Sequence, residues 1–166
     1  MHFDGESSTE GNNVRIIVFS PTEKPYQYSF QLNFECTNNI AKFEALALGL
    51  QKSLKLECRH LKTFSDSELV IDMIKGTYPP TKKVFRHYID IINRSIKCFL
   101  CFNLTHIRRE LNAIANKLIV FASSPLRQLL QVRPCINVIS LYRPFVPDNE
   151  LNLGKFLTMM KTSIVF

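Results

Sequence analysis

The sequence predicts an α/β fold in which a mixed sheet of five strands is flanked by helices. Three strand patterns joined by turns come first, and helical patterns then alternate with two further strands. The resulting order, three strands, a helix, a strand, two helices, a strand and a helix, is typical of a mixed sheet with helices packed against it. A chain of 166 residues is also long enough to bury a core of its own.

Hydrophobic periodicity indicates the three strands that come first. Residues 1–5 form the end of a strand that runs into a turn, and residues 14–20 form a short buried strand. Over residues 26–34, apolar and polar side chains alternate at nine positions, which is the pattern of a half-buried strand. Because turns join these strands in succession, we expect an antiparallel meander.

The pattern then changes to helical spacing. Apolar residues recur at helical intervals from Ile40 to Leu50, and we expect Asn38 or Asn39 to cap this helix. The remaining elements follow in chain order: a strand over 60–66, a helix over 67–76, a helix over 81–97, a strand over 99–107 and a helix over 110–123. We therefore expect one domain over 1–124. From Pro125 the sequence is punctuated by proline without clear periodicity, so 125–166 is expected to be a C-terminal tether.

The net charge of +7 is unevenly placed. Up to residue 75 the chain has 8 basic and 10 acidic side chains, and beyond it 13 basic and 4 acidic ones. A basic second half favours a polyanion such as nucleic acid as the partner, reached mainly through that half. A solvated surface without a partner is the alternative that charge alone leaves open.

No apolar run approaches the ~18 residues that a membrane span needs. The first 13 residues are polar and acidic, which excludes a secretory signal. We therefore expect an intracellular protein, cytoplasmic or nuclear, that is monomeric and has no membrane partner. The five cysteines are expected to be reduced, and the pair Cys98 and Cys101 is interpreted as core thiols because no second pair completes a zinc site.

Two aspartates stand at predicted strand ends, and each is followed by a small residue. These are Asp4, followed by Gly5, and Asp66, followed by Ser67. Side chains at strand ends of an α/β sheet converge on one edge, where ligands bind. Two acids there repel each other unless a cation lies between them, which favours a divalent metal site. Two solvated turn aspartates are the alternative.

Four ordered segments carry a resemblance to a known family: "HFDGESS", "FECTNNIAKFEALALGL", "FSDSELVIDMIKG" and "HIRRELNAIANKL". They resemble the successive motifs of the type 1 ribonuclease H domain, and in particular the version found in plant gypsy-type long-terminal-repeat retrotransposon polyproteins. The later segment "LYRPFVPDN" is similar to the sequence that follows the domain in those polyproteins. The resemblance covers residues 1 to about 125.

The resemblance implies a ribonuclease H-like fold with a five-stranded mixed sheet and an RNA–DNA hybrid as the partner. It also implies cleavage of the RNA strand with two Mg²⁺ (or Mn²⁺) ions held by four carboxylates, one activating water and the other stabilising the leaving oxygen. Two of the four acid positions fall on Asp4 and Asp66. The other two fall on Lys42 and Asn116, which marks the chain as a degenerate copy that binds metal weakly at most.

Glu44 is no simple replacement for the acid missing at Lys42. Two residues along a helix correspond to a rotation of about 200°, so the two side chains face in different directions. Glu44 corresponds to a second glutamate of the family motif, and we expect it to be a surface charge.

The resemblance also implies residues that contact the substrate. Asn38 and Asn39 match positions that contact the hybrid near its minor groove, and His106 matches a histidine that assists turnover, although an ordinary strand-end histidine is the alternative. Further candidate nucleic-acid contacts are Ser67, Lys82, Lys83, Arg86, Arg108 and Arg109. The sequence thus predicts a ribonuclease H-like nucleic-acid-binding domain with impaired hybrid cleavage; the alternative is a non-catalytic binding or structural remnant.

Overall fold

The computed structural model describes residues 1–9, 11–113, 136–142 and 144. Within them lie six strands and three helices: β1 (His2–Ser8), β2 (Gly11–Phe19), β3 (Pro25–Leu32), α1 (Asn38–Lys55), β4 (His60–Ser65), α2 (Glu68–Lys75), α3 (Lys83–Ile96), β5 (Cys101–His106) and β6 (Ile136–Leu141). Residues 109–113 are also helical, at the start of the last expected helix, and the rest of that helix lies outside the described residues.

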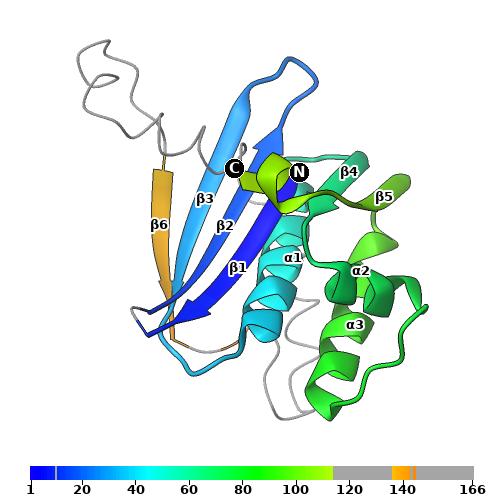
Figure 1. Ribbon diagram of the computed structural model, residues 1–166. Helices are drawn as coiled ribbons and strands as arrows, with labels where there is room; N and C mark the ends of the chain where they lie inside the picture. The colour runs from blue at the N-terminus through cyan, green and yellow to red at the C-terminus, as the bar shows by residue number, and fades with distance from the viewer. Residues whose placement is uncertain (10, 114–135, 143, 145–166) are drawn as a thin grey trace.

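The strands form one mixed sheet in the order β5-β4-β1-β2-β3-β6 (Figure 1). The first three strands make the expected antiparallel meander, in which β1 pairs with β2 along its whole length and β2 pairs with β3. On the other side of β1, strands β4 and β5 continue the sheet in parallel. The predicted α/β class and mixed sheet are therefore confirmed, with β1 at the centre.

A sixth strand corrects the expectation of five. Strand β6 runs parallel to β3, and Asn33 N adds a hydrogen bond to Leu141 O (2.7 Å). It lies in the region 125–166, for which the sequence predicted a C-terminal tether because no clear periodicity was present. The sequence Ile136–Leu141, "INVISL", is rich in β-branched residues, and the outer edge of β3 offers backbone groups that a strand can pair with.

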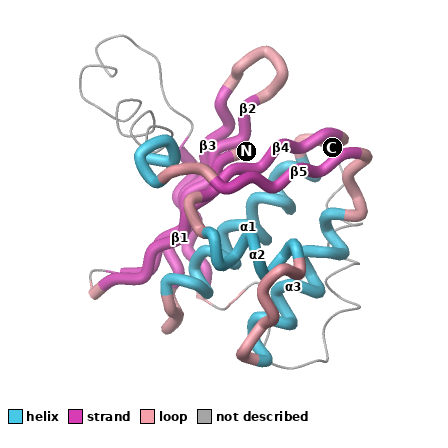
Figure 2. The backbone as a smooth tube through the Cα atoms, turned by 45° about the vertical axis from the view of Figure 1, so that its right-hand side comes forward, coloured by secondary structure: helices cyan, strands magenta, loops and turns pink. Residues whose placement is uncertain are grey.

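The core lies between the sheet and the helices. Helix α1 packs along β1 and β2, and α3 packs against α1 (Figure 2). Inward residues of the sheet such as Phe3 and Phe30 are almost completely buried. Phe43 of α1 stacks on Phe85 and Tyr88 of α3, with ring centroids 5.4 and 5.5 Å apart. This aromatic stack fixes α3 against the helix that carries Lys42.

The cap of α1 differs from the prediction. Thr37 has the extended backbone conformation of an N-cap residue, and its Oγ1 accepts a hydrogen bond from Ile40 N (3.4 Å). Asn38 and Asn39 are instead the first two helical residues. Threonine competes well for this position because its hydroxyl reaches the same backbone donor.

The C-terminal end of α2 agrees with the prediction. Gly76 is its C-cap residue and adopts the left-handed conformation (φ 78°), which is typical of a glycine that ends a helix.

Candidate active site

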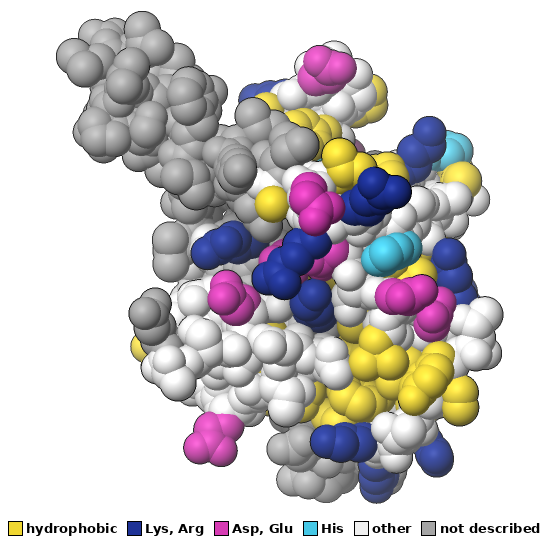
Figure 3. Space-filling model, viewed as in Figure 1, with side chains coloured by type: hydrophobic (Ala, Val, Ile, Leu, Met, Phe, Trp, Pro, Cys, Tyr) yellow, Lys and Arg dark blue, Asp and Glu magenta, His cyan; other side chains and the backbone are white. Residues whose placement is uncertain are grey.

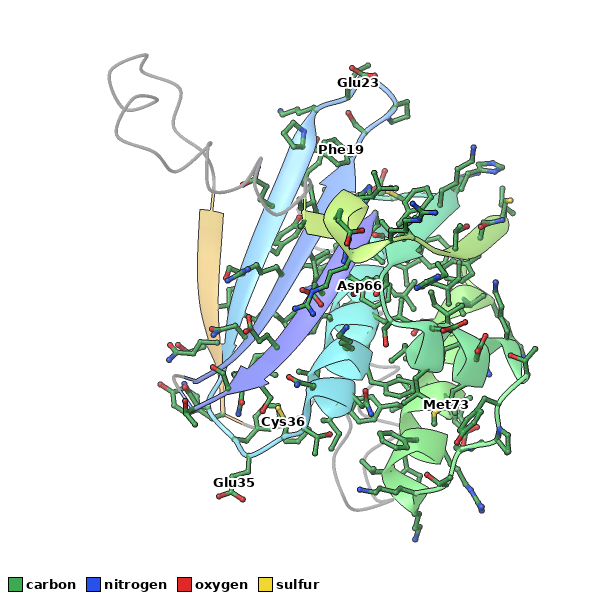
Figure 4. All side chains as sticks on the ribbon, in the orientation of Figure 1. Phe19, Glu23, Glu35, Cys36, Asp66 and Met73 are labelled. Carbon is green, nitrogen blue, oxygen red and sulfur yellow. The ribbon has the colours of Figure 1, made fainter. Side chains whose placement is uncertain are left out.

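Of the two acids expected at strand ends, only Asp66 lies at one; β1 continues past Asp4 to Ser8, because its pairing with β2 extends along the whole strand. Asp4 is the third residue of central strand β1, and Asp66 directly follows β4. Strands β1 and β4 are parallel and are joined by a backbone hydrogen bond from Phe64 N to Met1 O (2.9 Å). The carboxylates therefore come from adjacent strands at the middle of the sheet, where Figure 4 labels Asp66.

A glycine lets α1 approach β1 closely at this point. A Cβ atom on Gly5 would lie 2.2 Å from the carbonyl carbon and oxygen of Ala41 and 2.5 Å from the backbone nitrogen of Lys42. These are backbone atoms of a helix, which cannot move aside singly, so the crossing needs a residue without Cβ. Gly5 therefore sets how near α1 brings Lys42 to Asp4.

Lys42 reaches both acids. Its Nζ lies 3.1 Å from Asp66 Oδ1, to which it donates a hydrogen bond, and 3.8 Å from Asp4 Oδ1. The exposed fractions of the side chains are 20% for Lys42, 27% for Asp4 and 10% for Asp66. Water therefore screens this ion-pair triad only partly, and the ammonium lies where a cation shared by the two carboxylates would lie.

The groups around Asp4 act on its pKa in both directions. Burial raises the pKa of the Asp4 carboxyl above its ordinary value, and the negative charge of Asp66 raises it further. Three groups act in the opposite direction: the Lys42 ammonium, the Gly5 N–H, which donates to Asp4 Oδ1 (2.9 Å), and the Arg15 guanidinium. The charge of Asp66 thus disfavours the charged form of Asp4, and the basic groups partly offset this.

Arg15 is a member of the site that the sequence patterns did not identify as one. It lies on β2 directly opposite Asp4 in the antiparallel pairing, and its side chain is exposed. Only the register of β1 and β2 could have identified Arg15, because residues that lie opposite each other in two paired strands have neighbouring side chains. In Figure 3, Lys and Arg side chains lie beside Asp and Glu side chains near the middle of the visible face.

Glu44 is not a surface charge, contrary to the expectation. Its side chain is fully buried, and its Oε1 accepts a hydrogen bond from the Tyr88 hydroxyl of α3. The predicted rotation away from Lys42 is confirmed, but it turns Glu44 into the interface between α1 and α3 rather than into solvent. The buried acid is tolerated because a hydroxyl donor of α3 meets it there.

Two candidate contacts lie beside Asp66. His106 is the last residue of β5, pairs in register with Ser65 and is exposed. Ser67 is the N-cap residue of α2, is 7% exposed, and its backbone N–H donates to Ser65 Oγ (3.3 Å). His106 therefore stands at the same edge of the sheet as Asp66, while Ser67 presents little side-chain surface.

The asparagines at the start of α1 lie near the far end of β1. Asn38 is exposed, and its Oδ1 accepts a hydrogen bond from Ser7 N (2.6 Å). Asn39 is half-buried. The Asn38 side chain thus connects the end of β1 to the beginning of the helix that carries Lys42.

The basic candidates form two exposed groups. Lys82, Lys83 and Arg86 lie at the start of α3, and Arg108 and Arg109 follow β5. Asn116, the fourth position implied by the resemblance, lies outside the described residues. The structure therefore brings Asp4, Lys42 and Asp66 into contact, and it places the basic residues on separate elements.

The described residues do not by themselves fit a divalent metal ion. Among the described residues, no group of three or more His, Cys, Asp or Glu side chains could hold one. The two carboxylates that converge are already bridged by an ammonium, and Mg²⁺ prefers several negatively charged or carbonyl oxygens with near-octahedral geometry. Lysine supplies no such oxygen.

The family described as Reverse transcriptase-like matches residues 2–122, which is most of the described part of the chain. The chain belongs to this family. Among curated proteins, no sequence matches it.

The solved structures similar to this Reverse transcriptase-like domain include several ribonucleases H. Ribonuclease H1 from the halophilic archaeon Halobacterium salinarum is 21% identical with a TM-score of 0.64, and 68% of this chain aligns with 86% of that one. The N-terminal ribonuclease H domain of a Mycobacterium tuberculosis protein, solved as a maltose-binding-protein fusion, is 20% identical with a TM-score of 0.59, covering 70% and 86%. LC11 ribonuclease H1 from compost, solved with an RNA/DNA hybrid, is 21% identical with a TM-score of 0.61, covering 70% and 90%.

These similarities establish a ribonuclease H-like fold, as the motif resemblance predicted. Sequence identities near one residue in five show the fold alone, so the chemistry has to be argued from the residues of the site. Within the described residues, no helix combines the length and the hydropathy needed to cross a membrane.

Proposed function

We propose that this domain binds nucleic acid in the manner of a ribonuclease H, with an RNA–DNA hybrid as the preferred class of ligand, and that its hybrid-cleaving activity is severely impaired. In this proposal the chain derives from a plant gypsy-type retrotransposon polyprotein. Residues 1–124 carry the functional site, and 125–166, of which Ile136–Leu141 pairs with β3, are the remnant of the following polyprotein segment.

The contact between Lys42 and the two acids carries the proposal of impaired cleavage. Hybrid cleavage in the resembling family needs Mg²⁺ or Mn²⁺, and Asp4 and Asp66 are the acids left to hold it. With the Lys42 ammonium 3.1 and 3.8 Å from their oxygens, a metal ion must displace a bound cation before it can be coordinated. Asn116, at the fourth acid position, would offer a carbonyl oxygen without the charge that a hard cation prefers. Any metal bound there would be bound weakly.

Exposed basic groups support the proposal of binding. Lys82, Lys83 and Arg86 at the start of α3 and the pair that follows β5 offer cations to phosphates, and the second half of the chain is strongly basic. A protein of similar fold, LC11 ribonuclease H1, was solved with an RNA/DNA hybrid. Asn38 and Asn39 at the start of α1 are proposed to contact the hybrid, and His106 to lie beside the scissile strand.

The decisive experiment measures binding and cleavage on the same labelled RNA–DNA hybrid. We expect binding at low salt, with cleavage in Mg²⁺ or Mn²⁺ far slower than that of an active ribonuclease H1 run in parallel. DNA duplex and single-stranded RNA of equal length serve as competitors for the preference. Efficient cleavage by the parent protein would contradict the proposed impairment. If the protein bound none of these ligands at low salt, the alternative of a structural remnant without nucleic-acid binding would remain.

A further inference from the structure

We infer that the Lys42 ammonium is the permanent cation of this site, so that the domain binds nucleic-acid phosphates here without a divalent metal ion. This inference rests on the proposed nucleic-acid binding and deepens it. In this inference, the carboxylates of Asp4 and Asp66 are already neutralised within the protein before a polyanion approaches.

The charges around Asp4 balance without an added ion. Asp4 and Asp66 supply two negative charges, Lys42 contacts both, and Arg15 stands opposite Asp4 across the β1–β2 pair. Two uncompensated carboxylates would repel a phosphate brought to this face, since like charges at a binding surface oppose association. Lys42 and Arg15 remove this repulsion. In a site made of carboxylates alone, bound metal ions would have to neutralise the charge instead.

The cation is fixed by the fold rather than supplied by a mobile surface chain. Gly5 allows the backbone of α1 at Ala41 and Lys42 to cross β1 at close range, and the next residue, Phe43, is fully buried. The lysine stem therefore starts from an immobile point. Its ammonium lies against Asp66, which is only 10% exposed, where the attraction between charges exceeds that of a fully solvated pair.

A free metal ion competes poorly with this ammonium. Because Lys42 is part of the same chain, its effective concentration at the carboxylates is of about millimolar order or higher. This is comparable with the concentration of Mg²⁺ in a typical assay. Mg²⁺ also gives up its water reluctantly and gains at most two carboxylates among the described residues. Adding Mg²⁺ should therefore leave the site as it is.

The inference makes opposite predictions for charge-removing and charge-keeping variants of Lys42. Lys42→Met keeps the aliphatic stem and removes the cation, so it uncovers two carboxylates that a divalent ion can then bridge. Lys42→Arg keeps the positive charge. Lys55→Met is the matched control, because it removes an equal charge from an exposed position of the same helix, about 20 Å away along its axis.

The test is the dissociation constant for a labelled RNA–DNA hybrid, measured by fluorescence anisotropy in EDTA and in excess Mg²⁺ at equal ionic strength. The intactness of the hybrid is checked by gel after each titration. For the parent and Lys42→Arg we expect Mg²⁺ to give no gain in affinity. For Lys42→Met we expect binding weakened by roughly tenfold in EDTA and largely restored by Mg²⁺. Lys55→Met should change affinity equally in both buffers.

Two results would overturn the inference while leaving the proposed function intact. One is parent binding that requires Mg²⁺, and the other is a folded Lys42→Met protein that binds as tightly as the parent in EDTA. Should Lys42→Met fail to fold, as judged by circular dichroism, the parent and Lys42→Arg titrations decide the matter by themselves. If no protein binds hybrid in either buffer at low salt, the proposed function fails and this inference fails with it.

Discussion

The Glu44 carboxylate of α1 accepts a hydrogen bond from the Tyr88 hydroxyl of α3, and both side chains are almost completely buried. The pair lies on the opposite side of α1 from Lys42, beside the stack of Phe43 on Tyr88. It connects the helix that carries the site to α3, which begins at Lys83 after the N-cap residue Lys82. Together with the aromatic stack, this contact holds the basic start of α3 in place relative to the acid cluster.

Replacing Tyr88 with Phe should destabilise the protein by about 1–3 kcal/mol, because the buried Glu44 carboxylate loses a hydroxyl donor. The measurement is the urea midpoint of unfolding for the parent and the variant. Tyr78→Phe is the matched control, since Tyr78 is 45% exposed and should change stability by no more than about 0.5 kcal/mol. Equal stability of the Tyr88→Phe protein and the parent would show that the contact contributes nothing.

Replacing Gly5 with Ala should cost about 3 kcal/mol, because the added methyl group meets backbone atoms of Ala41 and Lys42. Gly49→Ala is the control, since its Cβ would meet the flexible end of the Met1 side chain at 2.7 Å. There the gain in helix propensity, about 1 kcal/mol, opposes the crowding. Thermal unfolding of both variants distinguishes them, and a Gly5→Ala protein as stable as Gly49→Ala would contradict the close crossing of β1 and α1.

The double variant Lys42→Glu with Asn116→Asp should rebuild a four-carboxylate site. We expect it to cleave hybrid well above the parent and to bind Mg²⁺ more tightly, whereas the parent binds at most one divalent ion with affinity of about millimolar order. Neither single change should suffice, because the two metals act together. Without metal the double variant should be less stable than the parent, since its carboxylates repel one another.

The rescue is checked by hybrid cleavage and by calorimetric titration with Mg²⁺. A parent as active as the double variant would contradict the placement of the site at Lys42. Two tight Mg²⁺ sites in the parent would contradict it as well.

Hybrid affinity should fall steeply with salt, with a slope near −0.9 in log K against log salt for each phosphate neutralised. Reversal of Lys82, Lys83 and Arg86 to Glu should weaken binding and make the slope shallower. Each of the three reversals is also made singly and compared with Lys24→Glu, at the β2–β3 turn, which changes the charge by the same amount. A slope that is unchanged in the triple variant would exclude the start of α3 from the binding face.

The described cysteines should label at two rates. Cys98 and Cys101 are exposed, which corrects their interpretation as core thiols, and they should react first with iodoacetamide. Cys36 and Cys58 are half-buried, and burial raises the pKa of both thiols above their ordinary value of 9.0. Their smaller thiolate fraction slows alkylation near neutral pH, and raising the pH past 9 should accelerate it. Residue-resolved mass spectrometry gives the order, and labelling in urea should abolish it.

Local patterns in the sequence determined most of the sheet and the helices. Alternation over residues 26–34 predicted β3, and helical spacing from Ile40 to Leu50 predicted α1, because these periods depend only on backbone geometry. The spacing of the motifs also placed Asp4, Lys42 and Asp66 in one candidate site. That three-way proximity followed from the resemblance, since the residues are far apart in the chain.

Only the tertiary structure decided how those residues meet. The burial of Glu44 required α3 to pack on the side of α1 away from Lys42, and a helical period gives the angle between two side chains without saying which one faces the core. Arg15 entered the site through the register of β1 and β2. Strand β6 formed because the edge of β3 was available to a distant segment. Each of these depends on pairing between segments remote in sequence, and no local period encodes such pairing.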